Sequence, residues 1–344
     1  MRDPSVSTSI ADKYLVAASM GRDLDAFARD TYGIDIGPAA EALGLDVDLF
    51  QNIDAAISQD RFCRLLQALA GEAEDPEFGL KYARAYRGGG TGAFGYGILN
   101  APDVRSAMRF MFKFLSLTCD FGYLRYEVGG STARLEWTFS PVIVQREQFV
   151  DFTTAVCIKL VATYFETDWL PNEARLERQP PKKVASYRQT MARTVRFSCK
   201  YNAVFVSVGD LSAPNPRADE RLFDLMMRQC EARLQSTRRT LSLEERVITE
   251  IFEDLGRTDV AIDKIAKRLA LSERSLQRHL KAKNLTFQSL VDQARREQST
   301  RLLKRTDLSL SEISDRLGFS ATSAYTRSAR RWYGMPPSEV RAQP

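Results

Sequence analysis

The chain has 344 residues, 44% of them hydrophobic and 27% charged, with 49 Lys and Arg against 44 Asp and Glu. This balance excludes a disordered or fibrous chain and predicts about two globular domains, each large enough to bury a core. The single histidine, His279, argues against metal centres and nucleophilic triads, so the sequence predicts no metal and no cofactor.

No segment is expected to enter a membrane. The first 30 residues are charged and lack the apolar core of a secretion signal, and the longest apolar stretch, 152–165, contains Lys159 and is too short to span a bilayer. The cysteines are odd in number, far apart and without a C-x-x-C pair. We therefore expect a cytoplasmic protein with reduced thiols at Cys63, Cys119, Cys157, Cys199 and Cys230.

The N-terminal body, residues 1–235, is predicted to mix helices with strands. Gly129-Gly130 lies between two alternating segments and indicates a β-hairpin. The class of this body is therefore α+β. The predicted helices are 59–71, 76–86, 104–118 (begun by Asp103) and 149–165, and the predicted strands are 123–128, 132–139 and 203–208.

The hairpin and two of the helices offer apolar side chains to a common interior. Alternate residues of a strand share one face, and Val128 and Phe139 continue the two faces. These side chains either fill a core or wall a mostly apolar cavity for a small organic effector. The candidate cavity residues are Leu124, Tyr126, Leu135 and Trp137 on the strands and Phe110, Phe114 and Phe152 on the helices.

A glycine-rich segment, Gly90-Thr-Gly-Ala-Phe-Gly95, matches the G-x-G-x-x-G pattern of dinucleotide-binding loops. Such a loop needs a strand before it and a phosphate-facing helix after it. Residues 80–87 are predicted to be helical, and the apolar stretch after the glycines ends at Asn100 without a clear ribose carboxylate. We interpret the segment as a connection at the edge of a cavity, not as a nucleotide site.

The body ends in a predicted helix over 217–234 with one apolar stripe. Core packing within the body is the default interpretation of this stripe, and a dimer contact is the alternative. Residues 236–242, which are polar and basic, are predicted to be a linker. The stripe consists of Phe223, Met226, Met227, Cys230 and Leu234.

The last hundred residues contain one unit twice, over Ile265 to Arg278 and Ile313 to Arg327. Each copy predicts a short helix with Ile and Leu at i and i+4, a small residue at the bend (Ala270 or Gly318) and a second helix. This is a helix-turn-helix pattern. The copies are 48 residues apart before the bend and 49 after it. The second helices are expected to begin with Ser272 and Ser320.

Each second helix carries a polar stripe at i, i+3, i+4 and i+7. Arg can bind guanine, Gln can bind adenine, and Ser or Thr can contact a base or a phosphate. One such stripe is usually a solvated face, but two in register favour two successive major-groove contacts on DNA. The first stripe is Arg274, Gln277, Arg278 and Lys281; the second stripe is Ser323, Thr326, Arg327 and Arg330, opposite Tyr325, Ser328, Ala329 and Trp332.

Charge and helix-end signals follow the same division. Residues 257–344 hold 18 Lys and Arg against 9 Asp and Glu, a net charge of +9, which leaves −4 for the rest of the chain. Binding to nucleic acid predicts this asymmetry, and His279 is interpreted as a surface or phosphate-side residue. Capping boxes are predicted at Ser242–Glu245 and Ser309–Glu312, and Thr286 is expected to begin a helix.

Residues 243–341 resemble the DNA-binding domain of AraC/XylS-type bacterial transcription regulators. The matching stretches are 271–278 (LSERSLQR), 317–320 (LGFS) and 330–337 (RRWYGMPP). The resemblance implies seven helices, with a central helix at about 287–304 joining the two helix-turn-helix units. It also implies base contacts by Arg274, Gln277 and Arg278, then by Thr322, Ser323, Thr326 and Arg327.

One position departs from the family pattern. Position 329 is usually a large aromatic residue in these regulators and is Ala here. We therefore expect the second unit to pack more loosely and to contribute less to DNA affinity.

Residues 43–234 resemble the arabinose-binding or effector domain of one branch of this family. The marks are Phe78-Gly79-Leu80, the segment 95–99 (GYGIL), the hairpin, and Tyr201-Asn202-Ala203. The resemblance implies a small-molecule effector, which is not necessarily arabinose, because the branch accommodates varied ligands.

These features together predict a transcription regulator and not an enzyme. Its parts are an α+β effector and dimerisation domain (1–235), a linker (236–242) and an all-α DNA-binding domain (243–344). The implied partners are repeated promoter or operator sites in double-stranded DNA, RNA polymerase, an effector and a second copy of the chain, with activation the commoner mode in the family. The alternatives are an enzyme tethered to DNA and a ligand-independent architectural protein.

Overall fold

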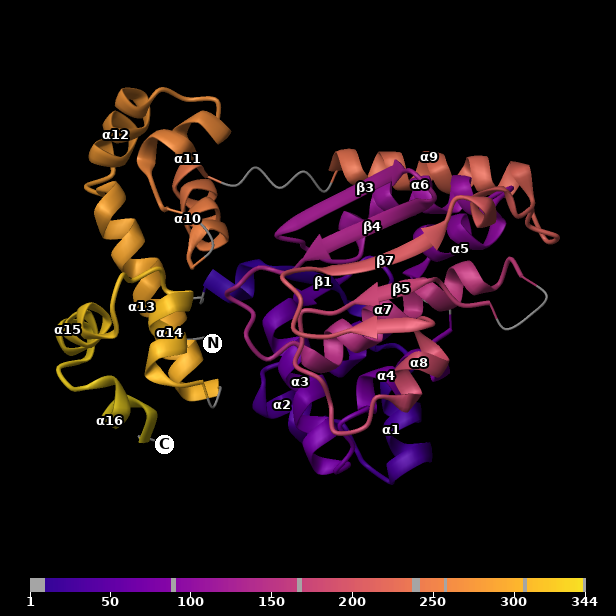
Figure 1. Ribbon diagram of the computed structural model, residues 1–344, viewed down its shortest axis with the longest axis horizontal. Coiled ribbons are helices and arrows are strands. Elements are labelled where there is room, and N and C mark those ends of the chain that lie inside the picture. The colour runs from indigo at the N-terminus through magenta and orange to yellow at the C-terminus, as the bar shows by residue number, and fades with distance from the viewer. Residues whose placement is uncertain are drawn as a thin grey trace. The chain divides into compact units, whose positions relative to one another are not determined.

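The computed structural model describes residues 10–87, 91–165, 169–236, 242–256, 259–305 and 308–342. By its internal contacts the chain separates into a first unit, 1–139 with 145–238, and a second unit, 140–144 with 239–344 (Figure 1). The division falls inside the predicted linker. Because 237–241 lie outside the described residues, the linker limits remain a prediction.

A twisted sheet of five described strands lies in the first unit, in the order β3-β4-β7-β5-β6. All neighbours are antiparallel except β5 and β6. β3 and β4 form the predicted hairpin, with Tyr126 opposite Leu135 and with Gly130 at a φ of +58° in the turn. A separate pair, β1 and β2, is antiparallel. The strands are β1 (Leu15–Ala17), β2 (Ala56–Ser58), β3 (Tyr123–Gly129), β4 (Thr132–Thr138), β5 (Glu173–Arg175), β6 (Thr194–Arg196) and β7 (Asn202–Ser207).

Helices surround this sheet, and the α+β class is confirmed. In Figure 1, α5, α6 and α9 gather on one side of the unit and α1 to α4 on the other. The α-helices are α1 (Leu24–Tyr32), α2 (Gly37–Ala42), α3 (Gln59–Glu72), α4 (Phe78–Ala85), α5 (Ala93–Asn100), α6 (Val104–Phe114), α7 (Glu147–Ala162), α8 (Ala185–Thr190) and α9 (Glu220–Ser236). The 3-10 helices are η1 (Ile10–Lys13), η2 (Ala18–Gly21), η3 (Val47–Gln51), η5 (Leu115–Leu117) and η6 (Gly209–Ser212).

The predicted helix starting at Asp103 is shorter than expected. The Asp103 carboxylate accepts a hydrogen bond from the Ser106 backbone N–H at 2.7 Å and caps α6, as predicted. The α-helix ends at Phe114, and the last turn tightens into η5. This tightening is common at helix ends, where the carbonyls lack partners.

The buried helix α7 organises the core of the first unit. Phe152 of α7 stacks on Tyr82 of α4 with ring centroids 4.7 Å apart. A Cβ at Gly79 of α4 would lie 2.1 Å from the Gln148 carbonyl oxygen, so the two helices approach too closely for any side chain there. The Gln148 side chain also accepts a hydrogen bond from the Gly79 N–H at 2.8 Å. The mark Phe78-Gly79-Leu80 is therefore a packing site.

The apolar stripe of α9 packs within its own unit. Met226 and Cys230 are buried, and the Phe223 ring centroid lies 5.5 Å from that of Phe110 in α6. The default interpretation of core packing is confirmed for this stripe.

The glycine-rich segment lacks the surroundings of a dinucleotide loop. Gly90 lies outside the described residues, but the element before it is the helix α4, not a strand. Gly92 has a φ of +60°, and a Cβ there would lie 2.3 Å from Cδ1 of Ile53. Close packing explains this glycine, and Thr91 and Phe94 of the same segment line a small cavity, as expected of a connection at a cavity edge.

Seven helices are described in the second unit, as the family resemblance implies. Figure 1 shows α13 running between the α11–α12 pair and the α14–α15 pair. The helices are α10 (Leu243–Asp254), α11 (Ile262–Arg268), α12 (Glu273–Ala282), α13 (Phe287–Arg305), α14 (Leu310–Arg316), α15 (Thr322–Tyr333) and α16 (Pro337–Ala342).

Two predicted helix starts in this unit are confirmed by their hydrogen bonds. Ser309 and Glu312 form a complete capping box at α14, with the Ser309 N–H donating to the Glu312 carboxylate at 2.8 Å. Thr286 begins α13, because its hydroxyl oxygen accepts the Ser289 N–H at 3.0 Å. The box at 242–245 stays a prediction, since the Glu245 side chain lies outside the described part of the chain.

Candidate DNA interface and effector cavity

The first stripe lies entirely on the exposed face of α12. Arg274, Gln277, Arg278 and Lys281 are all exposed. The opposite face is buried through Leu276 and Leu280. Ser272 caps the helix, since its hydroxyl oxygen accepts the Ser275 N–H at 3.1 Å. The Gln277 amide donates to the Glu273 carboxylate at 2.9 Å, which holds it along the helix surface.

The second stripe is less uniformly exposed. Ser323, Arg327 and Arg330 of α15 are exposed, whereas Thr322 and Thr326 are half-buried. The Thr326 hydroxyl donates to the Thr322 carbonyl oxygen at 2.9 Å, which leaves the Thr326 oxygen as an acceptor. The second stripe therefore offers fewer long side chains than the first.

The start of α15 differs from our expectation. Its N-cap is Ala321, which makes no side-chain hydrogen bond, so the predicted start at Ser320 is wrong. The second turn is one residue longer than the first, as the change of spacing from 48 to 49 residues records. The residue that occupies the place of Ser272 is consequently Ala321 and not Ser320.

The face of α15 opposite the stripe is buried as predicted. Tyr325 and Ala329 are inaccessible to solvent and belong to one apolar cluster with residues of α13, α14 and α16. The Tyr325 hydroxyl lies 2.9 Å from the Ser299 hydroxyl of α13. Phe319 and Trp332 pack against the same cluster. The expectation that Ala329 loosens this packing remains a prediction.

The central helix α13 binds the second helix-turn-helix unit by polar contacts. The Arg295 guanidinium donates to the carbonyl oxygens of Leu317 and Gly318, both at 3.0 Å, and lies 4.6 Å from the Phe319 ring centroid. The Asp292 carboxylate accepts the Trp332 indole N–H at 2.9 Å. These bonds fix the turn and the end of α15 relative to α13.

The helix α10 connects the two helix-turn-helix units. Arg268 of α11 donates to the Asp254 carboxylate of α10 at 2.7 Å and also pairs with Glu250. Just after α10, Gly256 has a φ of +70°, and a Cβ there would lie 2.5 Å from the Arg316 carbonyl oxygen at the end of α14. The two helix-turn-helix units are therefore in contact through the backbone at Gly256 as well as through α13.

His279 lies on the exposed surface of α12, as expected. Its Nδ1 is 3.0 Å from the Ser275 carbonyl oxygen one turn earlier. In the part of the chain that the structure describes, no group of three or more His, Cys, Asp or Glu residues could hold a metal ion.

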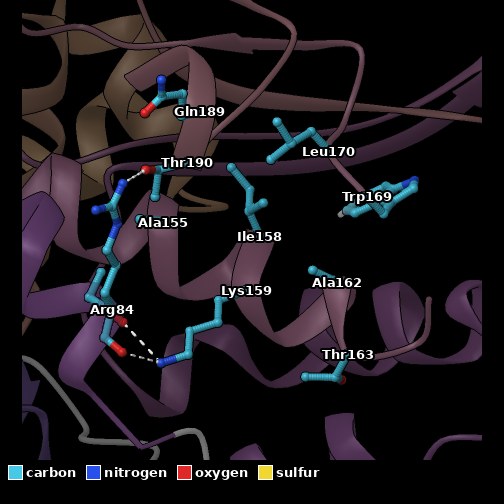
Figure 2. Close-up of a pocket in the computed structure, with 11 residues that line it drawn as sticks. Arg84, Ala155, Ile158, Lys159, Ala162, Thr163, Trp169, Leu170, Gln189 and Thr190 are labelled. Carbon is cyan, nitrogen blue, oxygen red and sulfur yellow. Dashed lines mark hydrogen bonds between the residues drawn. The ribbon is translucent and has the colours of Figure 1, made fainter. Parts of the chain in front are cut away.

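Two hollows flank α7 in the first unit. Figure 2 shows the larger, an open cleft of about 750 Å³. Lys159 donates to the carbonyl oxygens of Ala83, Arg84 and Tyr86 at 3.3, 2.7 and 2.8 Å. It thereby satisfies the C-terminal end of α4, whose carbonyls lack helical partners. The Arg84 guanidinium donates to Thr190 across the cleft.

The other hollow is a small apolar cavity of about 40 Å³, between α5, α7 and β4. Of the seven candidate cavity residues, only Trp137 and Phe152 line it. The other five belong to the buried core or the hairpin surface, and Val128 is exposed. Sequence reasoning did not name Tyr86 or Phe94 as cavity residues, because Tyr86 at the end of α4 and Phe94 in α5 reach the cavity through tertiary packing, which local periodicity does not place.

The cavity lining is uncharged. Among the described residues that line it, no Asp, Glu, Lys, Arg or His is present. Cys119 and Cys157 contribute thiols, and burial raises the pKa of Cys119 well above its usual range and that of Cys157 to about 12. Both thiols therefore remain neutral near pH 7.

Comparison with known proteins agrees with this geometry. A family model described as the arabinose-binding domain of AraC transcription regulators, N-terminal, matches residues 33–215, and a helix-turn-helix domain model matches 265–343. The HTH-type transcriptional regulator VirS of Mycobacterium tuberculosis (strain H37Rv) is 29% identical over 294 residues, which cover 84% of this chain and 85% of VirS. The ornithine utilization regulator of Pseudomonas aeruginosa is 25% identical over 289 residues, or 81% of each chain.

Among solved structures, the transcriptional regulator CdpR from Pseudomonas aeruginosa matches 90% of this chain and 96% of its own, with a TM-score of 0.37 and 17% sequence identity. No described helix of the present chain is long and apolar enough to cross a membrane. The first unit contains an arabinose-binding-type domain and the second an AraC-type helix-turn-helix domain, so the chain belongs to the AraC family of transcription regulators.

Proposed function

We propose that this regulator binds repeated promoter or operator sites in double-stranded DNA, with the first and second stripes in successive major grooves. One observation carries the proposal. Two polar stripes with the same residue spacing are backed by buried apolar faces, and the helices that carry them are supported within one domain by Arg268 against α10 and by Arg295 of α13. A rigid pair of recognition helices is what simultaneous contact with two grooves requires.

The side chains in the stripes suit distinct roles. Arg274, Arg278 and Arg327 have the guanidinium fork that pairs with guanine, and Gln277 can pair with adenine once released from Glu273. Lys281 and Arg330 lie at the far end of each stripe and suit phosphate contacts. Thr322, Ser323 and Thr326 offer hydroxyls to bases or phosphates.

Selection from a random pool of duplexes tests sequence specificity. The full chain should enrich one motif and bind it at least about 10³-fold more tightly than unrelated DNA at physiological salt. The DNA affinity should fall steeply with rising salt concentration, because the second unit carries the basic excess of the chain. Retention of all duplexes alike would contradict sequence-specific binding and favour an architectural role.

We propose further that a small-molecule effector in the first unit controls DNA binding, with activation through RNA polymerase. The apolar cavity supports this, because it shares wall residues with a second cavity against α9, the last described helix of the first unit. Phe94 and Thr118 line both this cavity and a smaller one of about 20 Å³, whose wall includes Cys230 and Arg233 of α9. An occupant that displaces Phe94 would therefore change the packing of α9.

We propose that the first unit also mediates a homodimer. The stripe of α9 is used internally, but β3 is an edge strand of the described sheet and carries exposed Tyr123 and Val128. Exposed Phe112 of α6 lies beside Tyr126 of the same strand, with ring centroids 6.0 Å apart. Exposed apolar groups beside an open edge are typical of an association surface. Sedimentation of the full chain should show a dimer that Val128→Lys weakens; a monomer at all concentrations would contradict this.

A further inference from the structure

The apolar cavity contains two buried polar groups that lack partners within the protein. Tyr86 and Trp137 both line it and are each only 2% exposed. The Tyr86 hydroxyl and the Trp137 indole N–H make no hydrogen bond among the described residues. A buried polar group without a partner costs about 1–3 kcal/mol, so such groups indicate a site where a ligand supplies the missing bond.

The hydroxyls of two threonines in the same lining are already satisfied. The Thr118 hydroxyl donates to the Leu115 carbonyl oxygen at 2.7 Å, and the Thr153 hydroxyl donates to the Phe149 carbonyl oxygen at 2.8 Å. The Trp137 indole N–H can only donate. Burial raises the pKa of Tyr86, so its hydroxyl keeps its proton and can also donate. The Tyr86 hydroxyl and the Trp137 indole N–H can therefore both be satisfied by an acceptor.

The larger cleft does not show the same deficit. Lys159 donates to three carbonyl oxygens and Arg84 donates to Thr190, so its two cationic groups already have partners inside the protein. The cleft is also open to solvent, which can hydrate its polar groups. A ligand would therefore supply missing hydrogen bonds to buried groups in the cavity and not in the cleft.

We propose that the cavity binds a small, uncharged and mostly hydrocarbon effector, whose single oxygen acceptor receives hydrogen bonds from Tyr86 and Trp137. This inference rests on the proposed effector control and names the ligand class. The rest of the ligand would contact apolar side chains such as Phe94, Phe152 and Leu160. A space of about 40 Å³ accepts roughly three water-sized groups, so a larger effector must displace part of the wall.

Two other ligand classes fit this cavity poorly. A pentose carries several hydroxyl groups, each needing a partner, and the cavity offers two unpaired groups. An amino acid such as ornithine carries full charges, and none of the described lining residues is charged. Burying an unpaired charge costs far more than burying a ketone oxygen. The family description of the domain therefore does not give the ligand class here.

A matched pair of probes tests the acceptor requirement. Cyclohexanone and methylenecyclohexane have nearly the same shape and differ in whether the exocyclic atom is an oxygen or a carbon. We would measure the dissociation constants of both for the full chain by ligand-detected NMR. The ketone should bind roughly fivefold more tightly, equivalent to about 1 kcal/mol for the net gain of a buried hydrogen bond. This comparison needs no variant, so it remains decisive if a substitution prevents folding.

Variants locate the effect. Tyr86→Phe and Trp137→Phe should each reduce the preference for the ketone, and the double variant should bring the ratio of dissociation constants to about one. Tyr126→Phe is the matched control, because its buried hydroxyl also lacks a partner among the described residues but lies outside the cavity lining. This control should leave the ratio unchanged.

The outcomes separate this inference from the proposed function. Equal binding of the two probes, or a preference unaffected by Tyr86→Phe and Trp137→Phe, would overturn the ligand class. Tight binding of L-arabinose that depends on Tyr86 would also overturn it. If the ketone binds as expected but no occupant of the cavity alters DNA affinity, the ligand class stands and effector control fails.

Discussion

The two helix-turn-helix units share a left-handed residue at the bend but are held by different side chains. Both turns use a left-handed residue, Ala270 with a φ of +56° in the first and Gly318 with a φ of +68° in the second. The first helix-turn-helix is braced by ion pairs of Arg268 with α10, whereas the second helix-turn-helix is braced by Arg295 from α13. The left-handed residue at the bend is therefore common to both copies, whereas the length of the turn and the side chains that support it differ.

The helix starts differ in the same way. Ser272 caps α12 through its side chain, while Ala321 at the start of α15 has no cap bond. The second stripe is also more buried and has shorter side chains. We infer that the first helix-turn-helix contributes more to specific DNA affinity and that the second helix-turn-helix depends more on bracing by α13.

The largest expected change in stability comes from the contact between Gly256 and Arg316, which joins the two helix-turn-helix units. Gly256→Ala should destabilise residues 239–344 by about 3 kcal/mol. The alanine would be held at a left-handed φ, and its Cβ would clash with the Arg316 carbonyl oxygen. Urea unfolding of the full chain measures this. Gly334→Ala is the control: its φ is +74° but no atom lies within 4 Å, so only about 1 kcal/mol should be lost. Equal losses of stability in the two variants would show that the contact between Gly256 and Arg316 is unimportant.

Removal of an arginine from each stripe should show how much each helix-turn-helix contributes to DNA affinity. Arg278→Ala and Arg327→Ala should each cost about 1–3 kcal/mol at the selected site and relax preference at one base position, with the larger loss for Arg278. Lys281→Ala should instead weaken all sequences alike and flatten the salt dependence. Competition binding against single-base variants of the site measures both. Unchanged specific affinity of Arg278→Ala would remove Arg278 from the proposed base contacts.

Exchange of the turn residues should have opposite effects in the two units. Gly318→Ala should cost about 1–2 kcal/mol, since a Cβ there is disfavoured at positive φ and would lie 3.3 Å from the Gly256 nitrogen. Ala270→Gly should stabilise the first turn by up to about 1 kcal/mol through release of the same strain. Thermal unfolding of both variants checks the signs; a loss of stability in Ala270→Gly would indicate that the alanine methyl group contributes by packing.

Exchange of the caps should have the smallest effect. Ser272→Ala should destabilise α12 by about 1 kcal/mol, and Ala321→Ser should stabilise α15 by a similar amount, because Ala321 already has the extended backbone of an N-cap. Amide hydrogen exchange in the first turns of α12 and α15 would report each change locally. Slower exchange in α15 of the Ala321→Ser variant is the expected result, and no change would show that another group already satisfies those amides.

Local patterns predicted much of this molecule because they depend on residues close in sequence. The hairpin, the helices of the second unit, the Ser309 capping box and the exposed stripes all follow from periodicity and short-range hydrogen bonds. The cap at Ala321 was missed because one added residue in the turn shifts the helix start. The cavity was only partly predicted, since Tyr86 and Phe94 meet Trp137 through tertiary packing that has no sequence period.

Hydroxyl-radical footprinting of one monomer equivalent of the full chain on its selected site tests the central claim most directly. We predict two protected windows on the same face of the duplex, centred about one helical turn (roughly 34–36 Å) apart, because both stripes belong to one braced domain. Arg278→Ala should weaken one window and Arg327→Ala the other. A single protected window per monomer, equally sensitive to both substitutions, would contradict the account.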